Sequence, residues 1–147
     1  MSEVLPAQIF YIYFSPYTAH AIEVDGIVYP TVEHAYQCQR YNNSEIINEI
    51  KSATSPLKAW QVSSKYKNQE ISDFQQKKVE IMKSLMRLKA LQHEEVKKAL
   101  LDSGEAKIVK HIYTFPPGDG FWDDGQSGEG QNIMGQIWME LREELKK

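Results

Sequence analysis

The chain is 147 residues long, carries a formal net charge of −3 and has an apolar fraction of 41%, which predicts one domain over residues 1–147 with a single sizeable core. With 17 basic against 20 acidic residues, it has no global positive field to gather nucleic acid or an anionic membrane, so an anionic ligand must be held locally. The lone cysteine, Cys38, excludes an internal disulfide framework.

The beginning of the chain, MSEVLPAQIF, has no basic segment followed by an apolar one, and no run of residues approaches membrane-spanning length. We therefore expect a cytoplasmic protein that does not act at a membrane. No four-Cys/His set has the spacing of a zinc site, so the sequence predicts no metal ligands and no cofactor. The oligomeric state is left open.

The N-terminal fifth has the pattern of a small β-sheet. Residues 8–14, QIFYIYF, are aromatic and β-branched, which favours a strand buried on both faces. Asp25-Gly26 stands between two short apolar runs and can supply the positive φ values of a tight hairpin.

The pattern becomes helical after the hairpin. Thr31 is a candidate N-cap for a helix over residues 32–42, with Glu33 in the first turn, where exposed amide groups and the helix dipole favour a negative charge. Ser44 is expected to start a second helix, and Ser55-Pro56 a third.

The longest periodic stretch covers residues 69–103. Ser72 and Gln75 have the spacing of a capping box, and the stretch is expected to divide near Gln92-His93.

The final third begins with a helix stop at Gly104. Residues 106–112 return to apolar character and precede a loop that Pro116-Pro117 forces. Asn132 is expected to cap the last helix, whose apolar residues repeat at three or four positions. Together these elements predict an α+β fold, a mostly helical single domain with a small N-terminal β-sheet.

Four polar side chains share one face of the first helix. Glu33, Tyr36, Gln37 and Arg40 recur at intervals of three and four residues, so a carboxylate, a phenol, an amide and a guanidinium lie on the same side. A solvated surface with an ordinary Glu-to-Arg relay fits this spacing equally well. If the face is a site, Glu33 should stay ionised, which suits a base or a stabiliser of positive charge.

Other ionisable residues have simpler explanations. His34 and Cys38 lie four residues apart with no third ligand in view, so both are expected to pack in the core, and His93 and His111 are expected to be structural or exposed. Lys89 lies four residues after Leu85 and seven after Met82, which places its ammonium close to the apolar stripe of the helix. A buried ammonium there needs a partner. Alternatively, its stem packs and its head reaches water.

Five of the eight glycines lie between residues 118 and 130, beside Trp122, Asp123 and Asp124. Glycines such as Gly125 let backbone amides approach a ligand, and this loop leads into the helix that starts after Asn132, an arrangement that favours phosphate. The ring of Trp122 offers a face for stacking a base. A flexible surface loop over a tucked tryptophan is the competing interpretation.

The motifs occur in a recognisable order. The chain contains FSP at 14–16, DGIVYPTVEHAYQCQR at 25–40, SP at 55–56, a segment ending in LMRLK at 85–89, and FWDDGQSGEGQNIMG at 121–135. This order resembles the NADAR, or YbiA-like, family over nearly the whole chain. Both the EH..Q block and the W.DG..G.G.N block are present.

The resemblance implies an N-glycosidase that cleaves the bond between ribose and a base or amine, in a phosphorylated riboflavin-pathway intermediate or in ADP-ribosylated guanine of nucleic acid. It implies that Glu33, Trp122 and Asp124 form the core of the site, with Asn132 and Lys89 in support. An ionised carboxylate near C1′ would stabilise the positive charge that develops on the ribose. We expect Glu33 and Asp124 to act as the acid/base pair, and Tyr36, Gln37, Arg40, Lys89, Gly125 and Asn132 to contact the substrate.

Two departures from the family pattern favour a different class of protein. Arg40 and Lys110 stand where the family usually has a lysine and a glutamate. A lysine at the first position could form a Schiff base with an opened ribose, whereas an arginine, which is always protonated, cannot. The alternative is therefore a non-catalytic module that binds ADP-ribose or an NAD-type nucleotide. Retention of Glu33, Trp122 and Asp124 favours the enzyme.

Overall fold

The computed structural model describes residues 8–112 and 118–147. The chain divides into two compact units, a central unit, Ser15–Glu95, and a terminal unit, Met1–Phe14 with Val96–Lys147. Among the described residues no helix combines the length and the apolar character needed to cross a membrane. The predicted loop at Pro116-Pro117 lies outside the described residues.

The central unit contains the predicted hairpin. Strands β2, Ile22–Val24, and β3, Ile27–Tyr29, are antiparallel with Val24 opposite Ile27. The two residues between them, Asp25 and Gly26, have φ values of 51° and 83°, the two positive values of a type I′ turn. The hairpin prediction is therefore confirmed.

Helix α1, Val32–Cys38, starts as predicted, because the Thr31 side chain accepts a hydrogen bond from the His34 amide. It ends four residues before the predicted end at residue 42. The reason is Tyr41, whose hydroxyl donates to the Ser63 carbonyl at 2.6 Å. To bury that ring against α3 the chain has to leave the helical path.

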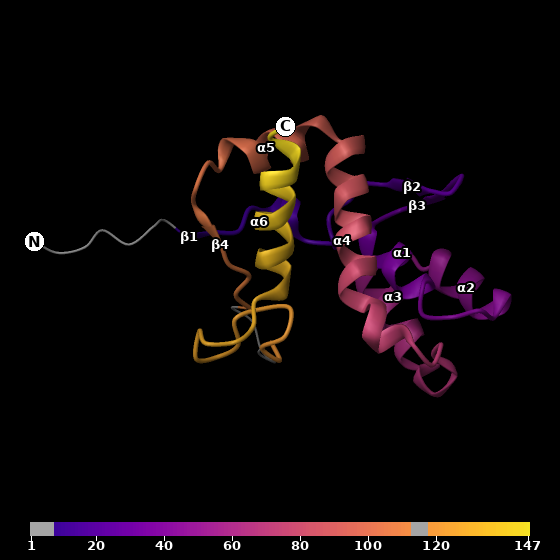
Figure 1. The fold of residues 1–147 in the computed structure, drawn as a ribbon. Helices are drawn as coiled ribbons and strands as arrows, with labels where there is room; N and C mark the ends of the chain where they lie inside the picture. Colours follow the sequence, from indigo (N-terminus) through magenta and orange to yellow (C-terminus); the bar gives the residue numbers. More distant parts are fainter. Residues whose placement is uncertain (1–7, 113–117) are drawn as a thin grey trace, which may run out of the picture. The chain divides into compact units, whose positions relative to one another are not determined.

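Two short helices pack against α1 and against each other (Figure 1). Helix α2, Ser44–Lys51, is capped by Asn43 rather than by Ser44, because the Asn43 side chain accepts from two first-turn amides. Helix α3, Pro56–Ser64, is capped by Ser55 as predicted.

The long periodic stretch divides where the sequence predicts. After a short 3-10 turn, Lys67–Gln69, helix α4 covers Phe74–Gln92 and helix α5 covers Glu94–Asp102. The predicted capping box is wrong: Asp73 occupies the N-cap position without a side-chain cap, and the Gln75 amide donates to Glu70 instead.

The terminal unit holds a second, parallel pair of strands, β1, Gln8–Ile9, and β4, Lys107–Ile108. The predicted strand over residues 8–14 is wrong beyond Ile9. A 3-10 turn, Ile12–Phe14, follows, and Ile12 is 73% exposed. This turn directs Phe14 into the core, where its ring lies 4.9 Å from that of Trp138 and its carbonyl accepts from the indole.

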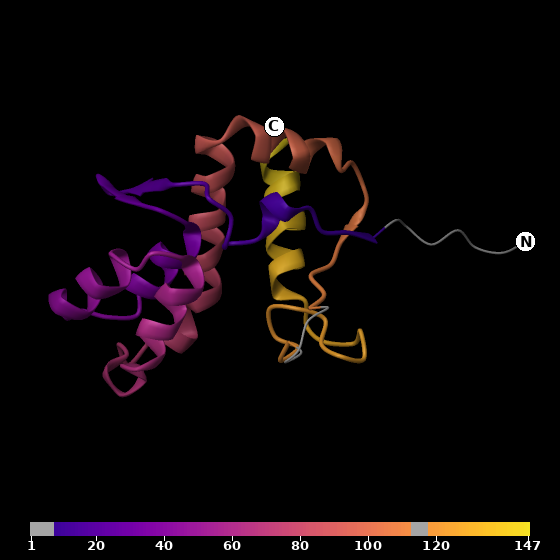
Figure 2. The same cartoon turned by 180° about the vertical axis from the view of Figure 1, so that it is seen from behind.

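Helix α6, Ile133–Leu145, packs on β4 within the terminal unit (Figure 2). The close approach depends on Gly135, since a Cβ there would lie 2.0 Å from the Ile108 carbonyl oxygen. Gly104 has a φ of 61° just after α5, which confirms the predicted helix stop.

Candidate functional site

The Glu33 carboxylate is fixed from within the central unit. Glu33 is 5% exposed, and its amide donates to the Pro16 carbonyl at 3.1 Å. Its Oε1 accepts a hydrogen bond of 2.7 Å from Gln37 Nε2, one helical turn later. The capped first turn of α1 therefore buries an acidic side chain and orients it with an amide.

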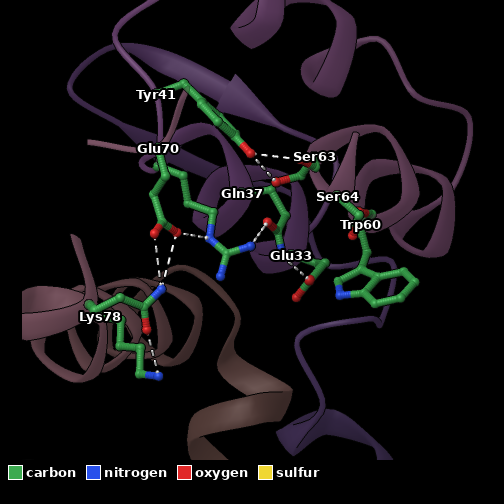
Figure 3. Close-up of polar contacts among 10 residues, drawn as sticks. Glu33, Gln37, Tyr41, Trp60, Ser63, Ser64, Glu70 and Lys78 are labelled. Atoms are coloured by element: carbon green, nitrogen blue, oxygen red, sulfur yellow. Dashed lines mark hydrogen bonds and ion pairs between the residues drawn. The ribbon is translucent and has the colours of Figure 1, made fainter. Parts of the chain in front are cut away.

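The orientation of Gln37 follows from its second neighbour. Arg40 Nη1 donates to Gln37 Oε1 at 3.1 Å, and a guanidinium can only donate. The amide group of Gln37 must therefore face Glu33. Beyond it, Arg40 Nε lies 3.1 Å from Glu70 Oε1, and Figure 3 shows this relay extending from Glu33.

Arg40 is held on aromatic rings. Its guanidinium carbon lies 5.0 Å from the centre of the Phe74 ring and 5.8 Å from that of Tyr36, within the range of cation–π attraction. Burial raises the pKa of Tyr36 above its ordinary value, so the phenol stays neutral. The predicted polar face is therefore a buried, connected network and not a solvated surface.

Tyr17 is a neighbour of this network that the sequence did not reveal. Burial and the nearby charge of Glu33 raise the pKa of Tyr17 above its ordinary value, although 40% of the residue is exposed. A neutral, partly exposed phenol beside a buried carboxylate can contact a sugar. No periodic pattern includes Tyr17; its only signal is its place directly after the FSP motif.

Lys89 is fully buried, and its head group does not reach water as the alternative supposed. Its Nζ donates to the Ser15 carbonyl at 2.8 Å and to Thr18 Oγ1 at 2.7 Å. Burial lowers its pKa to about 7. Lys89 therefore anchors the segment that carries Tyr17.

The glycine-rich loop of the terminal unit is organised around Asp123. Asp123 Oδ1 accepts from the amides of Gly120 and Gly125 at 3.1 and 2.8 Å. A Cβ on Gly130 would lie 2.8 Å from the Gly120 Cα, so the glycines serve close backbone packing. The amide of Gly125, an expected ligand contact, is thus occupied within the loop.

The first amides of α6, where the sequence predicts a phosphate site, are engaged within the loop. Asn132, Ile133 and Met134 donate their N–H groups to the carbonyls of Asp123, Phe121 and Trp122, in that order. The outer side of the loop forms an open depression of about 660 Å³, whose lining includes Asp119 and Glu129. These carboxylates oppose binding of an anion there.

Asp124 has a partner that the sequence did not reveal. Its Oδ1 lies 2.6 Å from His111 Nδ1, and the Asp124 side chain is only 14% exposed. The two residues are 13 positions apart, so no short motif links them.

Trp122 is half-buried, with the ring of Phe121 packed edge-on and its centre 4.9 Å from that of Trp122.

Asn132 stands at the N-cap of α6 but does not cap it with its side chain. It has a left-handed φ of 53°, and its side chain bridges to the strand β4 region. Oδ1 accepts from the Lys110 amide at 2.8 Å, and Nδ2 donates to the Ile108 carbonyl at 2.9 Å. Both polar atoms of this side chain are therefore engaged in joining loop and strand.

The core histidine and cysteine are as predicted. His34 is buried and bonded through its two ring nitrogens to Thr31 Oγ1 and the Ala53 carbonyl. Cys38 is buried, and burial raises the pKa of its thiol to about 12.

Two clusters of predicted site residues result. The central unit brings together Glu33, Tyr36, Gln37 and Arg40, and the terminal unit brings together Trp122, Asp124, Gly125 and Asn132. Lys89 belongs to the central unit but bonds to a different segment. The meeting of Glu33 with Trp122 and Asp124 around one sugar carbon stays a prediction.

The family model of the NADAR domain matches residues 6–146. The chain belongs to the NADAR family. An NMR structure of the Escherichia coli protein YbiA superimposes with a TM-score of 0.85 at 30% identity, covering 98% of this chain and 88% of that one. The α+β, mostly helical architecture is thus a NADAR fold.

Curated NADAR-related proteins include enzymes. The N-glycosidase YbiA of Escherichia coli is 34% identical over 90% of this chain and 80% of its own length. An N-glycosidase of Nostoc punctiforme is 31% identical over 90% of this chain and 85% of its own. A riboflavin biosynthesis protein of Vibrio vulnificus is 32% identical over 86% of this chain, which spans 34% of that longer protein.

Proposed function

We propose that this NADAR protein is an N-glycosidase that hydrolyses the C1′–N bond of a ribosyl-phosphate or ADP-ribosyl compound, with Glu33 at the reacting carbon. The observation that carries the proposal is the Glu33 carboxylate, buried and oriented by the Gln37 amide at 2.7 Å. The N-glycosidase names of relatives at 31% and 34% identity support the reaction type.

The role of Glu33 follows from the charge that develops in the reaction. As the C1′–N bond breaks, the ribose becomes cationic, and water then forms the C1′–O bond. A fixed carboxylate stabilises that cation and orients the water without having to reorganise. Arg40 and Glu70 hold Gln37 in position behind it, so the carboxylate is preorganised.

The leaving nitrogen needs a proton. Asp124 and His111, joined at 2.6 Å, form a carboxylate–imidazole pair of the kind that transfers protons in enzymes. We assign the donor role to this pair, and we assign Trp122 the stacking of the leaving base, a contact worth roughly 1–3 kcal/mol.

Tyr17 and Arg40 are the substrate contacts we propose in the central unit. Tyr17 is partly exposed next to Glu33, and Arg40 carries the charge that suits a phosphate oxygen. We assign Lys89 a positioning role because its head group is bonded to Ser15 and Thr18. Asn132 likewise positions the loop that carries Trp122.

The substrate we favour is a phosphorylated ribosylamine of riboflavin synthesis. A relative named as a riboflavin biosynthesis protein is 32% identical, and the net charge of −3 disfavours a long nucleic acid. ADP-ribosylated guanine in DNA is the second substrate class.

Incubation with each substrate class, followed by mass spectrometry of the products, tests this proposal. Release of ribose phosphate from the ribosylamine is the expected result, and release of ADP-ribose from DNA would identify the second class. If ADP-ribose stabilises the protein by linkage while neither substrate is cleaved, the protein is a binding module and the enzymatic proposal fails.

A further inference from the structure

Three side chains of the central unit converge beside Thr18, on a cluster that the proposed reaction does not use. His20 Nε2 lies 3.2 Å from Glu95 Oε1, and His93 Nδ1 lies 3.6 Å from the same oxygen. One ligand atom from each residue lies within 4.8 Å of the others. Two imidazoles and a carboxylate therefore point at one small volume.

The far nitrogen of His93 determines what its near nitrogen can do. His93 Nε2 lies 2.6 Å from the Ala21 carbonyl, and a carbonyl only accepts, so Nε2 carries the proton. In the neutral ring Nδ1 then presents a lone pair to Glu95 Oε1. Two acceptors that face each other at 3.6 Å repel weakly, and a cation or a proton between them would turn this repulsion into attraction.

The far nitrogen of His20 is held as well. Thr18 Oγ1 lies 2.6 Å from His20 Nδ1, accepts from Lys89 at 2.7 Å and lies 3.5 Å from the Ser15 carbonyl. All three contacts are satisfied when the hydroxyl donates to Ser15 and accepts from Nδ1–H. In this tautomer the lone pair of His20 lies on Nε2, facing Glu95. In the other tautomer Nε2–H donates to Glu95 at 3.2 Å, and a bound metal ion would displace that proton.

This pattern is that of a metal site with its supporting shell. Ligating histidines donate the other ring N–H to an oxygen, which fixes tautomer and orientation. In a tetrahedral zinc site with bonds of about 2.0–2.2 Å, two ligand atoms lie about 3.3–3.6 Å apart. The two separations to Glu95 Oε1, 3.2 and 3.6 Å, match that spacing closely.

We propose that His20, His93 and Glu95 bind a divalent transition-metal ion of the zinc type. The ion would join the segment before β2 to the junction of α4 and α5. Glu95 is half exposed, so a fourth position is open to water. None of the three residues has a role in the proposed reaction, although His20 shares Thr18 with Lys89.

The spacing explains why the sequence did not predict this site. His93 and Glu95 form a short H-x-E element, but His20 is 73 positions earlier than His93. Only the packing of the hairpin region on α4 brings the three together.

Titration of the protein, prepared without a histidine tag, with Zn²⁺ in a calorimeter tests the proposal, with the Co²⁺ absorption spectrum as a second readout. We expect one ion per chain and tetrahedral d–d bands. Glu95→Gln should weaken binding at least about tenfold, because loss even of a second-shell group costs that much. Glu94→Gln, an exposed neighbour in the same helical turn, should bind like the native chain.

The outcomes separate a site from a simple hydrogen-bonded cluster. Absence of stoichiometric binding, or equal loss of affinity in both glutamine variants, would overturn the proposal. Since His20→Ala could perturb folding, its circular dichroism spectrum is compared first, and a folded variant that still binds as tightly as the native chain would also overturn it.

Discussion

At the scale of single residues, the donor and acceptor groups of each side chain determine which way the hydrogen bonds of the central network run. A guanidinium only donates, so Arg40 turns the oxygen of Gln37 toward itself and the amide toward Glu33. Arg40 thereby orients Gln37, and Gln37 orients Glu33. A carboxylate fixed in this way acts on a developing cation without first reorganising, which is the physical basis of the role proposed for Glu33.

Replacement of Glu33 by glutamine should lower kcat by at least about 10²-fold, the scale of losing one preorganised electrostatic group. Glutamine keeps the shape and an acceptor for Gln37, so the melting temperature should change little. Steady-state kinetics and thermal unfolding measure the two effects. Glu45→Gln, an exposed first-turn glutamate of α2, is the control, and turnover that survives in Glu33→Gln would remove the carboxylate from the mechanism.

Lys89 should make stability depend on pH. In the folded chain its pKa is lowered to about 7, whereas in the unfolded chain the lysine keeps its proton up to about pH 10.4. Between these values the unfolded state binds more protons, so the free energy of unfolding rises with pH by up to about 1.4 kcal/mol per unit. Below pH 7 both states are protonated and this dependence disappears.

Urea unfolding at pH 7, 8 and 9 compares the native chain with Lys89→Met. The variant should lack the rise, while Lys77→Met, an exposed lysine of the same helix, should keep it. If the free energy of unfolding changes with pH equally in the native chain and in Lys89→Met, burial does not lower the pKa of Lys89.

At the scale of elements, the contacts between α6 and β4 depend on backbone proximity. Gly135 lets the Ile108 carbonyl approach the helix, and Asn132 joins the same carbonyl to the loop. The helix start is satisfied by loop carbonyls rather than by a ligand. The glycine-rich loop is therefore a structural support that presents Trp122 and Asp124.

Asn132→Asp should destabilise the protein by about 1–3 kcal/mol, because a buried donor to the Ile108 carbonyl becomes an acceptor. Denaturant midpoints measure the effect. The matched control is Asn43→Asp, since the N-cap of α2 uses only the side-chain oxygen and aspartate caps as well as asparagine. Equal midpoints for the two variants would mean that the Asn132 bridge contributes little.

At the scale of the whole molecule, the sequence predicts one domain, and the chain contains two compact units. The central unit carries Glu33, and the terminal unit carries Trp122 and Asp124. The chain crosses between the units near Phe14 and near Glu95. A chain of 147 residues that forms one domain is expected to unfold as a single unit.

Unfolding should therefore be a single cooperative transition. In Trp60→Phe the remaining tryptophans, Trp122 and Trp138, report on the terminal unit alone, whereas far-ultraviolet circular dichroism is dominated by the helices of the central unit. Trp60 is 45% exposed, so its loss should cost within about 0.5 kcal/mol. Coincident midpoints are expected, and separate midpoints would contradict the one-domain prediction.

The sequence alone determined the features that depend on near neighbours. The Asp25-Gly26 turn, the Thr31 and Ser55 caps and the break at His93 follow from local backbone chemistry and periodicity, and the ordered motifs indicated the family. Tertiary structure alone decided where α1 ends, where β1 pairs, and how Lys89, His111 and His20 find partners. These depend on contacts between distant segments, and a linear pattern carries no information on which buried polar groups must satisfy one another.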